Sequence, residues 1–261
     1  MQVDVVTAVH ASHAVFLPAA WRSLLGQSHT RWRWLVQLDG PADEPRAVLK
    51  ACGAMDDPRV SVASHGTSEG PAVTRNVALG RTSAPLVQNV DADDELEPGA
   101  LAALATALSG HPDAGYAVGH ARDLMGDGLL IDHPLPVLPG LLPRGALLPA
   151  WRTTPTDYRV PVHPAGVMWR RSLLLALGGW SALQGMEDTG VLMAASAVTE
   201  GVLVDAATLR YRRHATQMSK QTSKFAGGGE QIALIRQRAA VLSSLPSWSS
   251  IPSWSHTPDI P

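Results

Sequence analysis

Residues 85–94, Pro-Leu-Val-Gln-Asn-Val-Asp-Ala-Asp-Asp, join a short apolar run to a cluster of acids. The apolar run has the length of a buried strand, and the three carboxylates that follow it are Asp91, Asp93 and Asp94. Open α/β sheets bind ligands at the carboxyl ends of their strands, and Mg²⁺ commonly combines one or two carboxylates with substrate phosphates. The stretch therefore indicates a site for a metal ion and a diphosphate. An acidic turn that caps a helix from Pro98 would show the same pattern.

Size and composition are those of a globular protein with a large core. The chain has 261 residues, 45% of them hydrophobic, which is enough for one large domain. The net charge is −2 and the arginines are scattered, which argues against a nucleic-acid-binding protein. A single cysteine, Cys52, excludes an internal disulfide. No apolar run reaches the ~20 residues of a transmembrane helix, and the N-terminus lacks the basic region of a signal peptide. These features predict a soluble, cytoplasmic protein.

Apolar runs and helical spacings alternate along the first half of the chain. Runs rich in β-branched and aromatic residues predict strands over residues 3–9, 32–38, 59–63 and 86–90. Helical spacing, with proline and glycine at its ends, predicts helices over residues 16–25, 44–52, 70–79 and 98–108. Such alternation is typical of βαβ units and a mostly parallel sheet. We therefore expect the loops after Val9, Leu38 and Val90 to share one edge of a nucleotide-binding type of half-domain.

The second half carries weaker signals. The pattern predicts strands over residues 114–119, 202–204 and 208–211, and helices over residues 170–177, 186–197 and 230–242. Prolines interrupt residues 123–162, and an irregular stretch of this length is usually functional or mobile. From residue 243 onward the chain is rich in Ser, Pro and Trp, which predicts a poorly ordered tail.

Short motifs follow one another from the first predicted strand to residue 214. They are Val-Thr-Ala-Val-His (6–10), Ser-Leu-Leu-Gly-Gln-Ser (23–28), Leu-Asp-Gly (38–40), Gly-Pro-Ala-Val-Thr-Arg-Asn (70–76), Asp-Ala-Asp-Asp (91–94), Gly-Gly-Trp (178–180) with Glu-Asp (187–188), and Tyr-Arg-Arg-His (211–214). In this order the chain resembles the family 2 glycosyltransferases, inverting enzymes that transfer sugars from nucleotide diphosphates. The resemblance spans about residues 3–220. It implies an α/β fold of the GT-A type, with a mostly parallel central sheet flanked by helices.

The resemblance also implies how the domain is divided and where the nucleotide sugar binds. Residues 1–122 would form the nucleotide-sugar-binding half, residues 123–242 the acceptor-binding half, and residues 243–261 the tail. The implied nucleotide-sugar contacts are Thr7, Ala8, Asp39, Arg75, Asp91, Ala92 and Asp93. Asp39 would bind the base, and Arg75 would supply a permanent cation to the diphosphate or the base. The plain alternatives are a turn-forming aspartate before glycine and a surface arginine.

A divalent metal, Mn²⁺ or Mg²⁺, is implied as well, with Asp93 and His214 as its ligands. A nucleoside diphosphate is a poor leaving group until its developing charge is neutralised. A neutral imidazole can complete a metal shell that otherwise consists of oxygens. The alternative for His214 is a surface histidine among arginines.

Asp188 resembles the catalytic base of the family, with Glu187 beside it as a second catalytic candidate that contacts the acceptor. An inverting transfer needs a carboxylate that deprotonates the acceptor hydroxyl as it attacks. The same pair of acids could simply cap a helix. We expect His163 and Trp180 to line the acceptor side of the site.

Two other functions remain open on the sequence. A nucleotidyltransferase would usually carry a glycine-rich first loop with an arginine, whereas residues 8–13 are Ala-Val-His-Ala-Ser-His. A catalytically inactive sugar-nucleotide-binding module would be expected to lack Asp188, Asp91 or Asp93, and all three are present. The sequence therefore favours a glycosyltransferase that uses a UDP-sugar and an acceptor hydroxyl. Many Ala, Pro and Arg with few Lys indicate a bacterial source. The sugar, the acceptor and the oligomeric state stay open.

Overall fold

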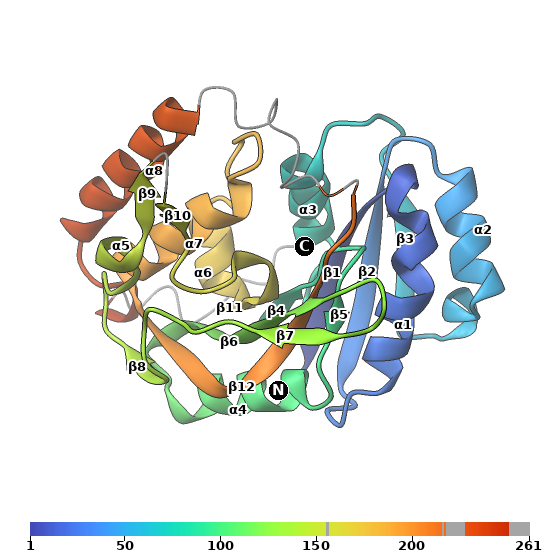
Figure 1. The fold of residues 1–261 in the computed structure, drawn as a ribbon, viewed down its shortest axis with the longest axis horizontal. Helices are drawn as coiled ribbons and strands as arrows, with labels where there is room; N and C mark the ends of the chain where they lie inside the picture. Colours follow the sequence, from blue (N-terminus) through green and yellow to red (C-terminus); the bar gives the residue numbers. More distant parts are fainter. Residues whose placement is uncertain (155–156, 216, 218–227, 251–261) are drawn as a thin grey trace.

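The computed structural model describes residues 1–154, 157–215, 217 and 228–250, which form a mixed sheet with helices on both faces (Figure 1). The strands of this sheet, in spatial order, are β3 (Val60–Ser64), β2 (Trp32–Asp39), β1 (Val3–His10), β4 (Leu86–Asn89), β11 (Met168–Arg170), β6 (Ala114–Leu124), β12 (Glu200–Arg212) and β5 (Glu95–Leu96). β7 (Leu130–Asp132) pairs with β6, and β8 (Gly140–Leu142) pairs with β12. β9 (Arg152–Thr154) and β10 (Asp157–Arg159) form a separate pair.

The direction of the strands brings distant loops to one edge of the sheet. β3, β2, β1 and β4 are parallel to one another, β11 is reversed, and β6 and β12 run in the direction of β4 again. The carboxyl ends of β1, β2, β4 and β12 therefore meet at one edge. The predicted grouping of the loops after Val9, Leu38 and Val90 is confirmed, because Val9, Asp39 and Asp91 border a single cavity there.

Helices pack on both faces of the sheet and create two cores. One core contains α1 (Leu17–Leu25), α2 (Asp43–Ala51) and α4 (Ala100–Gly110). The other contains α3 (Pro71–Gly80), α5 (Leu147–Ala150), α6 (Arg171–Ala176), α7 (Glu187–Val198) and α8 (Gly228–Ser243). Neighbouring residues of β1 divide between them, since Val5 belongs to the first core and Val6 to the second. Burial on both faces explains why the parallel strands are almost continuously apolar.

The predicted strands and helices of the first half are all present, with boundaries within two residues of those expected. The largest shift concerns α4, which begins at Ala100 rather than at Pro98 because Gly99 precedes it with a φ of +80°. A residue in this left-handed conformation cannot belong to a right-handed helix, and glycine adopts it at low cost. Figure 1 shows α1 and α2 at one end of the molecule and α8 at the other.

The second half is more regular than its sequence suggests. β12 is one continuous strand where two short strands were expected, because its register against β6 shifts between Leu203 and Ala207 without ending the pairing. β6 continues five residues beyond the predicted end at Gly119. The proline-rich stretch is built of short elements, namely β7, β8, α5, β9 and β10. β11 is a further strand that the sequence does not predict.

The chain after α8 is held against the body of the protein. The Nη2 atom of Arg144 donates hydrogen bonds to the carbonyl oxygens of Leu242, Ser243 and Leu245. Trp248 follows in a short 3₁₀ turn and packs into the core with α7. The first part of the tail is thus anchored, and residues 251–261 lie outside the described residues. None of the described helices has the length and apolar character needed to cross a membrane.

Candidate active site

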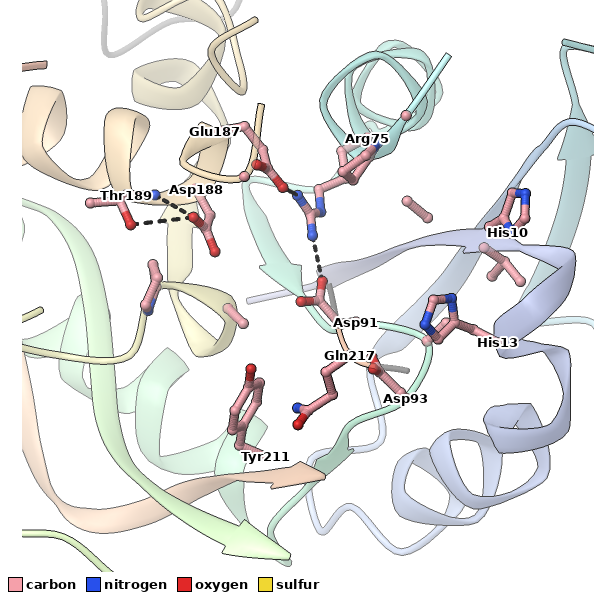
Figure 2. Close-up of a pocket in the computed structure, with 18 of the residues that line it drawn as sticks. His10, His13, Arg75, Asp91, Asp93, Glu187, Asp188, Thr189, Tyr211 and Gln217 are labelled. Atoms are coloured by element: carbon pink, nitrogen blue, oxygen red, sulfur yellow. Dashed lines mark hydrogen bonds and ion pairs between the residues drawn. The ribbon is translucent and has the colours of Figure 1, made fainter. Parts of the chain in front are cut away.

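A cavity of about 600 Å³ lies at the carboxyl edge of the sheet. Its walls come from the ends of β1, β2 and β12, the start of α3, the acidic loop after β4 and the start of α7 (Figure 2). The predicted site residues that line it are Ala8, Asp39, Arg75, Asp91, Ala92, Asp93, His163, Glu187 and Asp188. Thr7, Trp180 and His214 are not among its described lining residues.

Arg75 joins the two halves of the chain at the wall of the cavity. Its Nη2 donates to Oδ1 of Asp91 at 2.6 Å, and its Nη1 donates to Oε1 of Glu187 at 2.8 Å. The side chain is buried, so the alternative of a surface arginine is wrong. Burial acts to lower the pKa of Arg75, but Asp91, Glu187 and Asp188 together outweigh it and raise that pKa. The guanidinium is a fixed positive charge that holds the acidic loop beside the start of α7.

Asp188 is the second residue of α7 and borders the cavity. Burial raises the pKa of its carboxyl group to about 7, Glu187 and Asp91 add to this shift, and Arg75 acts against it. The backbone N–H of Thr189 donates to Oδ1 of Asp188 at 2.6 Å. A carboxyl group that titrates near neutral pH can accept a proton from a bound hydroxyl. The geometry therefore suits the predicted base.

An aspartate and two histidines meet beside the cavity, with Asp93 and His13 on its wall and His214 behind them. Oδ2 of Asp93 lies 2.9 Å from Nε2 of His214, and a ring nitrogen of His13 completes a group whose ligand atoms all lie within 4.8 Å of one another. Figure 2 shows His13 and Asp93 on the opposite side of Asp91 from Glu187 and Asp188. His214 is half-buried with its ring 4.8 Å from that of Phe16, so it is not a simple surface histidine. One carboxylate and two imidazoles are suitable ligands for a divalent metal.

His13 is a candidate ligand that the sequence analysis missed. It lies in the 3₁₀ turn η1 (Ala11–Phe16), directly after β1. The sequence feature that could have identified it is the pair of histidines at residues 10 and 13. They follow the predicted strand over residues 3–9, and ligands bind at the carboxyl ends of such strands. Burial lowers the pKa of His13, Asp93 acts against this shift, and His214 and His10 add to it. A lowered pKa favours the neutral ring, which is the form that binds metals.

Hydrogen bonds of Asp93 and Asp94 with Arg212 hold the acidic loop against β12. Oδ1 of Asp94 accepts a hydrogen bond from the backbone N–H of Arg212 at 2.9 Å, and Nε of Arg212 donates to the carbonyl oxygen of Asp93 at 2.8 Å. Asp94 is buried, and this burial, with Asp93 and Asp91 nearby, raises its pKa. The side chain of Arg212 also pairs with Glu95. These contacts tie the loop to the end of β12, next to His214.

Asp39 and Thr7 have structural partners. The carboxylate of Asp39 accepts hydrogen bonds from the backbone N–H groups of Glu69 at 2.7 Å and Gly70 at 3.1 Å. It thereby holds the entry to α3 while it borders the cavity. The hydroxyl of Thr7 is buried and accepts a hydrogen bond from Nε1 of Trp34 at 2.9 Å. The side chain of Thr7 thus packs in the core, whereas Ala8 lines the cavity.

His163 lines the cavity, with its ring 4.4 Å from that of Tyr211. Burial lowers its pKa to about 4, against the opposing effects of Asp91 and Asp123. Its Nδ1 accepts a weak hydrogen bond from the backbone N–H of Ala165 at 3.4 Å. A neutral ring with an accepting Nδ1 carries its proton on Nε2. His163 can therefore donate a hydrogen bond but is uncharged at pH 7.

Trp180 lies behind Arg75, with its ring centre 5.9 Å from Cζ of that residue. Its backbone forms two hydrogen bonds with Asn76: the N–H donates to Oδ1 at 2.8 Å, and the carbonyl accepts from Nδ2 at 3.0 Å. The Arg-Asn and Gly-Gly-Trp motifs thus contact each other. Gly179 permits this contact, because a Cβ atom at this position would lie 2.0 Å from Oδ1 of Asn76.

Asn76→Ala is expected to lower the free energy of unfolding by about 1–3 kcal/mol, because it leaves two backbone groups of Trp180 without partners. Urea unfolding followed by circular dichroism measures this change. Val77→Ala, at a half-exposed position of the same helix, is the matched control and should shift the free energy by less than about 0.5 kcal/mol. Equal effects of the two substitutions would contradict the importance of the Asn76–Trp180 contact.

Comparison with known proteins gives a family and a set of similar structures. A family model described as Glycosyl transferase family 2 matches residues 4–173. The chain is similar to residues 1–349 of S. aureus TarS in complex with UDP-GlcNAc, with a TM-score of 0.71 and 18% identity over 91% of this chain and 66% of that chain. It is also similar to the mannosyltransferase PcManGT from Pyrobaculum calidifontis in complex with GDP-Man and Mn²⁺, with a TM-score of 0.60 and 15% identity over 97% of this chain and 73% of that one. These likenesses show a shared fold. No curated protein matches the chain.

Proposed function

We propose that the protein performs a metal-dependent, inverting transfer of a sugar from a UDP-sugar to an acceptor hydroxyl. The chain belongs to glycosyl transferase family 2 and has the GT-A fold. Glycosyl transfer follows from the family. The donor, the metal, the stereochemistry and the residue roles are the proposal. One observation carries it: Asp188, whose pKa is raised to about 7, lines the same cavity as Asp91 and Asp93, and Asp93 groups with His13 and His214.

In the proposed reaction Asp188 is the general base. An acceptor hydroxyl beside Asp188 loses its proton to the carboxylate while its oxygen bonds to the anomeric carbon of the donor sugar. The bond from that carbon to the nucleoside diphosphate breaks on the opposite face, so the configuration inverts. Arg75 holds Glu187 and Asp91 in place during this step, and Glu187 supports the acceptor side.

The nucleotide would lie along the wall formed by Ala8, Asp39, Arg75, Asp91 and Ala92, with Asp39 closest to the base. Asp93 and His214 would hold the divalent cation, and their ligand atoms are close enough to share an ion. A bound cation would neutralise the charge that develops on the leaving diphosphate. His163, as a neutral donor, would orient the acceptor or the donor sugar. We propose no acceptor contact for Trp180, because it packs behind Arg75.

The related structures support a nucleotide sugar as the donor. TarS was solved with UDP-GlcNAc and with UDP, and PcManGT with GDP-Man and Mn²⁺. A chain that spans 66% of the TarS fragment can differ from it in substrate and acceptor. The choice between uridine and guanosine therefore needs a direct binding measurement.

Isothermal titration of UDP and of GDP, each with Mn²⁺ and again with EDTA, tests the proposal. We expect UDP to bind in the presence of Mn²⁺, and we expect EDTA or Asp93→Ala to weaken this binding by at least ~10-fold, because a ligand of the metal is lost. Asp132→Ala, at an exposed position of β7, is the matched control. Binding of neither nucleotide to folded protein would exclude the proposed donor site, and equal binding in EDTA would exclude the metal.

A further inference from the structure

The structure brings a third protein ligand to the cation site. His13, Asp93 and His214 come from the turn after β1, the loop after β4 and the segment after β12. Two ligand atoms on one ion at ~2.1 Å each lie no more than ~4.2 Å apart. The 2.9 Å between Asp93 and His214 meets this limit. All three ligand atoms lie within 4.8 Å of one another, so an ion that gathers them needs at most a small movement of His13.

The rings of both histidines are held by packing. The ring centre of Phe16 lies 4.8 Å from that of His214 and 6.4 Å from that of His13, and the two imidazoles meet edge to face at 5.9 Å. The guanidinium of Arg212 lies over the Phe16 ring, with Cζ 5.3 Å from the ring centre. Side chains fixed in this way need little reordering when an ion binds.

The remaining contacts of the cluster are those that orient metal ligands. The hydroxyl of Ser12 lies 3.3 Å from Nδ1 of His13 and 2.9 Å from Nδ1 of His10. A partner at Nδ1 of His13 leaves Nε2 for an ion, and metal-binding histidines usually have such a partner at the second nitrogen. The backbone N–H of His214 donates to Oε1 of Gln217 at 3.2 Å, and Nε2 of Gln217 donates to the carbonyl oxygen of Arg212 at 2.5 Å. The His13 and His214 segments are therefore held by neighbouring residues that are not themselves ligands.

We propose that His13 is a third protein ligand of the cation, so that the protein binds a divalent transition metal before the nucleotide arrives. A site with one carboxylate and one imidazole depends on the diphosphate for much of its shell. With a second imidazole, three ligands are in place without any substrate. Imidazole is a weak ligand for Mg²⁺ and a better one for transition metals. The site therefore takes Mn²⁺ in preference to Mg²⁺. This inference adds a metal ligand to the proposed function. It rests on that function for the part that the metal plays in the reaction.

Titration of MnCl₂ into nucleotide-free protein, followed by electron paramagnetic resonance, tests the proposal without an activity assay. Wild type is expected to bind one Mn²⁺ with nitrogen couplings from two imidazoles, and more tightly than it binds Mg²⁺. His13→Ala is expected to weaken Mn²⁺ binding at least ~10-fold and to leave one nitrogen coupling. His111→Ala removes an exposed histidine beyond α4 and should bind Mn²⁺ as wild type does.

The outcomes separate this inference from the proposed function. Unchanged Mn²⁺ binding and couplings in a folded His13→Ala variant would overturn the ligand role of His13, even if UDP binds with Mn²⁺. A wild-type protein that takes up Mn²⁺ only together with UDP would overturn binding before the nucleotide. Binding of Mn²⁺ that depends on His13, in a protein that binds neither UDP nor GDP, would support this site and contradict the proposed donor. Thermal unfolding of His13→Ala establishes that the variant is folded.

Discussion

Asp188→Asn is expected to lower kcat/KM for sugar transfer by ~10²–10⁴-fold, the usual contribution of a general base. The amide has nearly the shape of the carboxylate but cannot accept the proton of the acceptor hydroxyl. The assay is release of UDP from the nucleotide sugar that binds in the titration, with water or a screened alcohol as acceptor. Binding of UDP and Mn²⁺ should be unchanged, because Asp188 is not a ligand of either in the proposed site. A variant that retains more than about a tenth of the wild-type rate would contradict the role of Asp188 as the base.

The pH dependence supplies a second readout for the same residue. Since the pKa of Asp188 is raised to about 7, its carboxyl group is mostly protonated at pH 6, and only the ionised fraction can act as a base. Wild-type kcat/KM is expected to rise tenfold per pH unit below the pKa and to level off above pH 8. The residual activity of Asp188→Asn should lack this rise. The same rise in the variant would assign the titration to another group.

Arg75→Met is expected to lower the free energy of unfolding by about 3–5 kcal/mol, because it leaves the buried Glu187 and the adjoining Asp91 without their cation. The side chains of Arg75 and Glu187 are only 5% and 7% exposed, so water cannot replace the lost partner. Urea unfolding at pH 8 measures the change. Arg75→Lys should have a smaller effect, since lysine keeps the charge but cannot reproduce the forked pair of hydrogen bonds.

A double variant tests whether the unpaired charge is the cause. Arg75→Met with Glu187→Gln removes the charge of both partners and should be less destabilised than Arg75→Met alone. A double variant whose loss equals the sum of the two single losses would contradict this explanation. So would an Arg75→Met protein as stable as wild type.

The first half of the fold follows from local sequence. Its strands are buried on both faces, so each appears as a continuous apolar run such as Val3, Val5 and Val6, and helices with clear ends separate them. The position of Asp91 and Asp93 at a carboxyl end follows from the same pattern. Asp188 could be placed only through the motif order, because two acids at a helix start also serve as a plain cap.

The features that the sequence missed depend on distant partners. β11 has three residues, too few for any periodicity, and it exists because β4 and β6 flank it. Thr7 was assigned to the site because it lies in the first motif, but alternation along β1 directs it toward Trp34. His13 acquires its role only when β12 brings His214 beside it. Such contacts leave no periodic signal in one segment.

The reversed strand β11 lies between β4 and β6, although it follows β6 in the chain by more than forty residues. During synthesis, the ribosome therefore releases β4 and β6 well before the strand that joins them. Until Met168–Arg170 emerges, one edge of β4 is without its final partner, and an open strand edge invites pairing with other chains. Residues 1–122 alone leave β4 and β6 without the strand that joins them, and we expect chaperones to be needed most while the proline-rich stretch is being made.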